Sequence, residues 1–205
     1  MKYAPHRALL CCTLALTAAA ACAQSTPSRN SGFWHEDGNT FLPYTRGGYV
    51  GVNLGQSDYQ TDCGVGNYAC DKPKIAGKLY VGGMFSPYVG VELGYLHMGR
   101  ADRAGGRTQA QGGNVSLVGR IPINAFHVFA KAGGTWGRTN VSSNALSGVP
   151  SGRDSGWGGS YGVGAGYELG RSTAIVVEWE NHDFHFAGTG REGVKAVSIG
   201  LMQRF

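Results

Sequence analysis

The stretch Tyr161-Gly-Val-Gly-Ala-Gly-Tyr-Glu-Leu-Gly-Arg-Ser-Thr-Ala-Ile-Val-Val-Glu-Trp-Glu180 decides the fold class of this chain. Apolar residues alternate with small or charged residues on both sides of Gly170-Arg-Ser172. A period of two predicts β-strands, because successive side chains of a strand point to opposite faces. The stretch therefore predicts two strands joined by a short turn.

The same alternation recurs along the chain and predicts eight strands. One face of each strand is apolar, while the other mixes glycine with isolated charges. A solvated face needs long polar side chains, whereas the interior of a narrow barrel needs small or interlocking ones. We therefore predict an all-β fold, an eight-stranded antiparallel transmembrane β-barrel of up-and-down topology with lipid on its apolar face. The alternating stretches are 49–55, 78–85, 89–95, 114–121, 128–136, 160–167, 175–180 and 197–205.

The connections between these stretches alternate in length. Bacterial outer-membrane barrels have short periplasmic turns and longer extracellular loops, whereas a secreted β-sandwich, the alternative, has no reason to alternate so regularly. The short connections are 86–87, 124–125 and 170–172, and long loops are predicted at 58–72, 100–111, 140–156 and 184–193.

Aromatic residues cluster near both ends of the predicted strands. Such clusters are typical of the two girdles by which a barrel meets the membrane surfaces, and they predict localisation in a bacterial outer membrane. Four flank the short turns (Phe85, Phe126, Tyr167, Phe205) and four lie toward the long loops (Tyr95, Trp136, Tyr161, Trp179).

The N-terminus predicts export. Lys2 and Arg7 precede an apolar run that ends in Ala21-Cys-Ala23, the small-x-small pattern that signal peptidase cuts. A membrane-anchoring helix and a lipoprotein are the weaker alternatives, because the run is too short to span a bilayer and the lipobox is poor. We expect a cleaved signal peptide over residues 1–23, a periplasmic leader over 24–46 and the outer-membrane barrel over 47–205.

Composition agrees with a membrane barrel. Charged residues make up 15% of the chain and glycine 35 of its 205 residues, yet no later segment approaches a transmembrane helix of about 20 apolar residues. The net charge of +5 falls to +3 once Lys2 and Arg7 leave with the signal peptide. That charge is too small and too evenly spread to indicate nucleic-acid binding. We expect no nucleic-acid partner and no cofactor.

Two cysteines remain after removal of the signal peptide. Cys63 and Cys70 lie among turn-forming residues in a chain bound for an oxidising compartment, which predicts a local disulfide. The alternative, a metal-binding pair, lacks a nearby histidine or a second pair of thiols.

Strand parity places five charged residues on the inward face. Charges in a narrow interior of low dielectric constant persist only when they are paired, so we expect lumen ion pairs that plug the barrel. Counting from the short turns makes Glu92 and Arg120 the first candidate pair, with Lys78 or Lys131 as competitors for Glu92. The five candidate residues are Lys78, Glu92, Arg120, Lys131 and Glu178.

Three motifs that could suggest an enzyme, a metal site or a nucleotide-binding loop do not meet the requirements of those functions. A lipid A deacylase would need a His-x-Ser pair, and no histidine of the chain has serine two positions later. His182-Asp-Phe-His185 could suggest a metal site or a protease-like pair, but too few further ligands converge, and a polar strand end leading into an external loop is preferred. Gly162-Val-Gly-Ala-Gly166 lies mid-strand with no following helix, so it fails as a nucleotide-binding loop.

Three segments resemble a known family: Phe41-Leu-Pro-Tyr-Thr-Arg-Gly-Gly-Tyr-Val-Gly51, Gly90-Val-Glu-Leu-Gly-Tyr95 and Gly200-Leu-Met-Gln-Arg-Phe205. Through them the chain resembles the small outer-membrane β-barrel proteins of proteobacteria, relatives of the transmembrane domain of outer membrane protein A that are loosely grouped as porin-like. The resemblance covers nearly all of the mature chain, and its motifs mark fold and location rather than an activity.

The resemblance also implies a C-terminal assembly signal and partners. The terminal aromatic residue that the barrel-assembly machinery reads in this family corresponds to Phe205, and Leu201 gains weight because Gln203 stands where the family often has tyrosine. We expect the assembly machinery and periplasmic chaperones as partners in biogenesis. We expect the finished barrel to be a monomer surrounded by outer-membrane lipid and lipopolysaccharide.

These observations predict a structural role rather than an enzyme. We expect an outer-membrane protein that presents extracellular loops and contributes to envelope integrity or surface interaction. The alternatives, in order, are a narrow porin-like solute channel and an enzyme that modifies outer-leaflet lipid.

Overall fold

The computed structural model describes residues 47–59, 75–103, 106–142, 151–187 and 190–205. The predicted signal peptide, the periplasmic leader and the disulfide between Cys63 and Cys70 lie outside these residues and stay predictions. Within the described part of the chain, no helix is long and apolar enough to cross a membrane.

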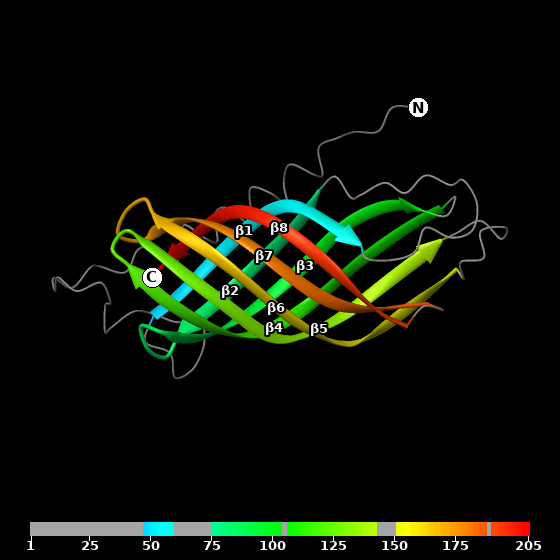
Figure 1. Ribbon diagram of the computed structural model, residues 1–205, viewed down its shortest axis with the longest axis horizontal. Helices are drawn as coiled ribbons and strands as arrows, with labels where there is room; N and C mark the ends of the chain where they lie inside the picture. The colour runs from blue at the N-terminus through cyan, green and yellow to red at the C-terminus, as the bar shows by residue number, and fades with distance from the viewer. Residues whose placement is uncertain (1–46, 60–74, 104–105, 143–150, 188–189) are drawn as a thin grey trace, which may run out of the picture.

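Eight antiparallel strands form a closed barrel, in which each strand pairs with its neighbours in the chain and β8 returns to β1 (Figure 1). Backbone hydrogen bonds in both directions between Gly48 and Phe205 close the ring at one end. The predicted eight-stranded up-and-down barrel is therefore confirmed. The strands are β1 Gly47–Tyr59, β2 Ala76–Met84, β3 Val89–Arg103, β4 Gly106–Ile123, β5 Phe126–Ser142, β6 Gly152–Glu168, β7 Thr173–Phe186 and β8 Gly190–Arg204.

The strands extend further than predicted at the end opposite the short turns. β3 and β4 pair as far as Arg103 and Gly106, and β7 and β8 as far as Phe186 and Gly190, so the long loops predicted at 100–111 and 184–193 are wrong. β5 and β6 likewise pair up to Val141 and Gly152, inside the loop predicted at 140–156. Polar residues and glycine indicated loops there, but antiparallel pairing uses only backbone groups and continues without an apolar face.

The other end carries the three short connections that the sequence predicted. The connection between β4 and β5 is a hydrogen-bonded turn at Asn124-Ala125, where Asn124 adopts φ 54°. Asparagine tolerates this left-handed conformation better than most residues, which suits it to a turn of two residues.

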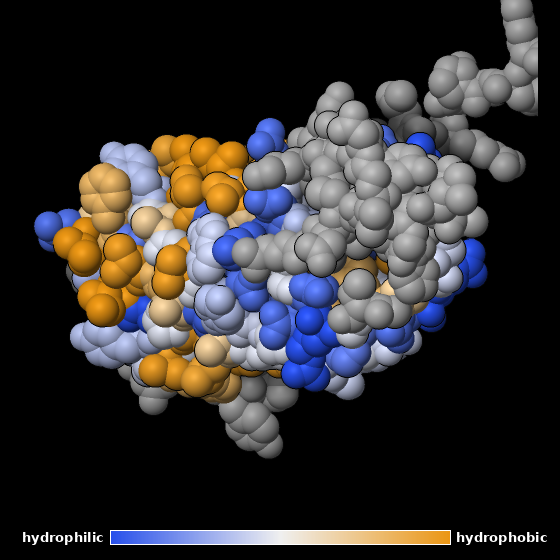
Figure 2. Space-filling model, turned by 45° about the vertical axis from the view of Figure 1, so that its right-hand side comes forward, coloured by the Kyte–Doolittle hydropathy of each residue, from blue (hydrophilic) through white to orange (hydrophobic). Residues whose placement is uncertain are grey.

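Burial alternates along the strands because their two faces meet different surroundings. On β5 the pattern holds from Phe126 to Ser142 with one irregularity near Gly134. The exposed face carries the large apolar residues, including Leu54, Leu117 and Leu201. Figure 2 shows hydrophobic residues gathered over the half near the short turns and hydrophilic residues over the opposite half.

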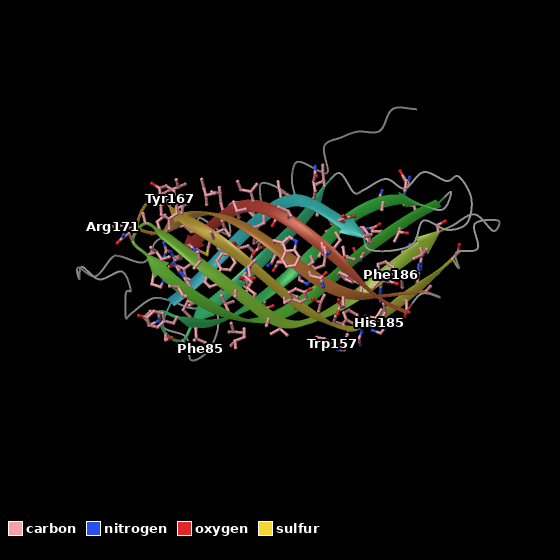
Figure 3. All side chains as sticks on the ribbon, viewed as in Figure 1. Phe85, Trp157, Tyr167, Arg171, His185 and Phe186 are labelled. Atoms are coloured by element: carbon pink, nitrogen blue, oxygen red, sulfur yellow. The ribbon has the colours of Figure 1, made fainter. Side chains whose placement is uncertain are left out.

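Aromatic pairs on the outward face of β5 and β6 mark both edges of the apolar band. Phe126 lies opposite Tyr167 at the short-turn end, with 4.8 Å between ring centroids, and Trp136 lies opposite Trp157 further along. Ten residues separate the two pairs on each strand, about 26 Å along the barrel axis at a strand tilt of about 40°. Figure 3 shows Tyr167 and Phe85 near the short turns and Trp157 toward the other end. This span matches the apolar band of about 25 Å in outer-membrane barrels.

Candidate functional site

The inward face of β7 shows how the interior of the barrel is layered. From the short-turn end, it presents small and branched apolar residues, then two carboxylates, then a histidine, then two aromatic rings. All seven are buried: Ala174, Val176, Glu178, Glu180, His182, Phe184 and Phe186. Side chains from other strands join these levels, so the lumen consists of stacked layers of different polarity.

Four residues form an ionic group near the short turns, here called the terminal cluster: Arg120, His127, Glu168 and Arg204. Arg120 Nη2 lies 3.1 Å from Glu168 Oε1, and His127 Nδ1 lies 3.0 Å from the same oxygen. Arg204 forms an ion pair with the other oxygen of Glu168. One carboxylate thus pairs with two guanidinium groups across the barrel, with the His127 ring beside it.

A predominantly apolar layer lies beyond the terminal cluster. Its cavity of about 20 Å³ lies between the terminal cluster and the next charged residues, and is lined by both. Such a volume holds about one water molecule, so this part of the lumen is packed rather than open. The buried apolar residues of the layer are Tyr49, Tyr80, Met84, Val118, Phe129, Ala174, Val176 and Met202.

The middle of the barrel holds five buried ionic side chains, here called the central cluster: Lys78, Lys131, Glu92, Glu178 and Glu180. Lys78 Nζ lies 3.0 Å from Glu92, 3.1 Å from Glu178 and 2.6 Å from Glu180. Lys131 Nζ lies 2.9 Å from Glu92 and 2.7 Å from Glu178. Two lysines therefore link three carboxylates from β3 and β7 across the lumen.

Uncharged groups complete the coordination of the central cluster. The Tyr49 hydroxyl donates to Glu92 at 3.2 Å, and the Asn53 amide donates to Glu178 at 2.7 Å. Both lysine ammonium groups lie 5.1 Å from the centroid of the Tyr80 ring, within cation–π range. Buried charges are costly unless their remaining hydrogen-bonding capacity is met, and these contacts meet much of it.

A second apolar layer, here called the outer seal, closes the interior beyond the central cluster. It is composed of side chains from β3, β4, β5, β7 and β8, with Tyr59 and Ala196 packed against it. His182 joins the two layers: Nδ1 lies 2.8 Å from the Thr135 hydroxyl and Nε2 lies 3.5 Å from Glu180. The members of the outer seal are Leu96, Met98, Ala110, Val141, Phe184, Phe186 and Val194.

Inward-facing glycines make room for the rings that fill the lumen. Tyr49 lies opposite Gly82 and Tyr80 lies opposite Gly51, and a Cβ atom on either glycine would overlap the facing tyrosine ring. Gly137 gives the same space to Phe184. The inward-facing glycines therefore leave the space that the aromatic rings occupy, and the two residue types pack against each other in the lumen.

All five predicted lumen residues are buried, and four of them meet in the central cluster. The predicted pairing of Glu92 with Arg120 is wrong, because the register places Ser116 opposite Glu92 and Arg120 four residues closer to the short turns. Arg120 binds Glu168 there. Lys78 and Lys131, which were predicted as competitors of Arg120, form the ion pairs with Glu92 instead.

Several residues of the two ionic clusters were not predicted, although their positions in the alternating strand pattern place them on the inward face. Glu180 follows Glu178 by two residues and shares its inward face. Glu168 and Arg204 each lie at a strand end, where residues next to turns are usually solvated, so parity there carried little weight. Only the closed barrel brings Glu168 of β6 to Arg120 of β4.

The segment His182-Asp-Phe-His185 forms the last part of β7, which ends at Phe186, so the preferred interpretation of a polar strand end is confirmed. His182 and Phe184 point inward, while His185 lies outward, so the two histidines do not face a common ligand. Among the described residues, no group of three or more His, Cys, Asp and Glu side chains is arranged to hold a metal ion.

The predicted assembly signal lies on the closing strand. Leu201 points outward with 52% of its surface exposed, and the Phe205 backbone bonds to Gly48. Recognition of these residues by an assembly machinery stays a prediction.

Comparison with known proteins agrees with this architecture. Residues 8–205 match the family model of the outer membrane protein beta-barrel domain. The chain is 28% identical over 167 residues to outer membrane protein A of Escherichia coli O157:H7, covering 77% of this chain and 47% of that protein. It therefore spans about half the length of that relative.

Two solved structures share the fold at low sequence identity. Neisserial surface protein A superposes with a TM-score of 0.60 at 12% identity, over 77% of this chain and 97% of that one. The attachment invasion locus protein Ail of Yersinia pestis superposes with a TM-score of 0.53 at 18% identity, over 78% and 98%. With its closed eight-stranded barrel and a family match over nearly the whole sequence, the chain belongs to the outer membrane protein beta-barrel domain family and resides in the bacterial outer membrane.

Proposed function

We propose that this barrel is a closed structural component of the outer membrane that displays its long hairpins at the cell surface for envelope integrity or surface interaction. The observation that carries the proposal is the central cluster, in which two lysines bridge three carboxylates across the lumen. An ion passing through would have to break these pairs in a site with little water.

The outer seal supports a closed lumen independently of the charges. Phe184 and Phe186 are buried within it at 0% and 1% exposure. A constriction lined by apolar side chains excludes water and thereby blocks ions. Conduction would therefore require rearrangement of two layers of different chemistry.

The length of the strands supports display at the surface. β5 continues six residues past Trp136, and its partner β6 begins five residues before Trp157. These segments project past the aromatic pair that marks the edge of the apolar band. Paired strands hold the hairpins in a fixed direction, which suits a surface that meets other molecules.

Planar-bilayer recording tests the closed lumen. Wild-type protein should give no steady conductance, whereas Lys131→Met, which leaves Glu92 and Glu178 with one cation fewer, should give openings. Lys195→Met, at an outward position of β8, is the matched control and should remain silent. Steady conductance of the wild type at the nanosiemens level would overturn the proposal and favour the solute channel.

A further inference from the structure

The outward face of β5 to β8 carries a group of basic residues around one tryptophan, here called the rim patch: Arg138, Arg153, Trp157, His185 and Arg191. Trp157 is 61% exposed and Arg138, Arg153 and Arg191 are exposed. Figure 3 shows Trp157 and His185 close to one another toward the end opposite the short turns.

The sheet register brings these residues together from four strands. Arg138 lies opposite Ser155, next to the facing pair Trp136 and Trp157, and Arg153 lies one outward position further along β6. From the other side, His185 Nε2 lies 3.1 Å from the Trp157 carbonyl oxygen, and Arg191 donates to that oxygen at 3.4 Å. Trp157 is thus bordered by cationic or titratable side chains on both sides.

The exposed arginines of β5 and β6 have no carboxylate partner among the described residues. Among the described residues, neither Arg138 nor Arg153 forms an ion pair, whereas Arg107 at the same end pairs with Asp102 at 3.5 Å. The outward carboxylate of β7, Asp183, accepts a hydrogen bond from Asn181. Two exposed guanidinium groups on neighbouring strands, with no ion-pair partner in the described part of the chain, favour an anionic ligand that both can reach.

Position on the barrel indicates what that ligand is. The first arginine of the rim patch, Arg138, lies one outward residue beyond the Trp136–Trp157 pair, where the apolar band ends. Strand alternation points the side chains of the patch sideways from the barrel wall. At that height the lateral neighbours of a membrane barrel are lipid headgroups rather than soluble molecules. The outer leaflet of this membrane carries lipid A, whose glucosamine disaccharide bears phosphate groups. Guanidinium groups bind phosphate through paired hydrogen bonds, and a tryptophan at the interface packs against the sugar and the first acyl carbons.

We propose that the rim patch is a binding site for the phosphate groups of one lipid A molecule, with Arg138 and Arg153 as the phosphate ligands and Trp157 as the apolar platform. The site binds its lipid from the side, so it leaves the ends of the hairpins free. It does not depend on whether the lumen is closed, and its failure would leave the bilayer recordings unaffected.

Titration of the purified full barrel with bis-phosphorylated lipid A in mixed micelles tests the site. The double variant Arg138→Gln with Arg153→Gln should raise the apparent Kd about 30-fold, since each arginine near an anionic membrane surface contributes about a fivefold factor. Wild type should bind fully dephosphorylated lipid A as weakly as the double variant does. Migration of unboiled samples on denaturing gels verifies that each variant retains a folded barrel.

A matched control separates a defined site from general attraction to a negative surface. The pair Arg100→Gln with Arg107→Gln removes the same charge at the same end, but these arginines already contact Gln109 and Asp102. It should leave the Kd within about threefold of wild type, because both guanidinium groups already have partners on this chain. An equal loss in both pairs, an unchanged Kd in the first pair, or displacement of lipid A by a soluble sulfated glycan would each overturn the proposal.

Discussion

The lumen and the outer surface hold ion pairs of the same chemistry in opposite surroundings. Lys131 lies 2.7 Å from Glu178 with both side chains almost fully buried, while Arg107 lies 3.5 Å from Asp102 with side chains 62% and 67% exposed. The buried pair has no water to replace a lost partner, whereas the exposed pair does. The difference teaches that the loss of one partner of an ion pair is costly on the inward face of this barrel and nearly free on its outward face.

The largest expected effect is on the central cluster. Lys131→Met should lower the free energy of unfolding by about 3–5 kcal/mol, because it leaves the buried Glu92 and Glu178 with one cation fewer. Urea unfolding in lipid vesicles, followed by tryptophan fluorescence, measures it. Adding Glu92→Gln to the same chain should restore part of the lost stability. A double variant less stable than Lys131→Met alone would contradict the pairing of Lys131 with Glu92.

An intermediate effect is expected where glycine faces an aromatic ring. Gly51→Ala places a Cβ atom against the Tyr80 ring, so the ring must shift, at a cost of about 1–3 kcal/mol. Gly47→Ala on the same strand is the control, because its Cβ meets nothing within 4 Å. The same urea titration should separate the two variants, and equal midpoints would show that the ring and glycine are not interlocked.

The smallest effect is expected at the surface pair. Arg107→Gln should change the free energy of unfolding by less than about 1 kcal/mol, because water replaces the contact with Asp102. Comparing unfolding in low and high salt checks the reasoning, since the exposed pair is screened and the central cluster is not. A loss as large as that of Lys131→Met would remove the distinction between the two regions.

Strand parity predicted five of the charged residues that enter the lumen, but not which of them meet. Lys78 and Glu178 lie 100 residues apart in the chain and 3.1 Å apart in the barrel. Their meeting depends on the stagger between strands, which closure imposes on the whole sheet. Counting residues from the nearest turn takes no account of that stagger, so the count paired Glu92 with Arg120 instead of Lys131.

The ends of the strands were predicted least well for a related reason. Between Phe126 and Trp136 each outward residue lies in the apolar band and must be apolar or small, so the pattern is clear. The polar residues between Arg138 and Ser142 are compatible with either a loop or a strand. Only the backbone pairing with β4 and β6 shows that this segment is a strand. The rim patch was missed because its arginines lie in polar strand ends of this kind on β5, β6 and β8.

The sequence by itself determined the number of strands, their inward and outward faces and their place in a membrane, because all three follow from a period of two within single strands. The tertiary structure alone decided the central cluster, the terminal cluster, the outer seal and the rim patch. Each draws residues from strands far apart in the chain, and their heights become comparable only after the barrel closes on itself.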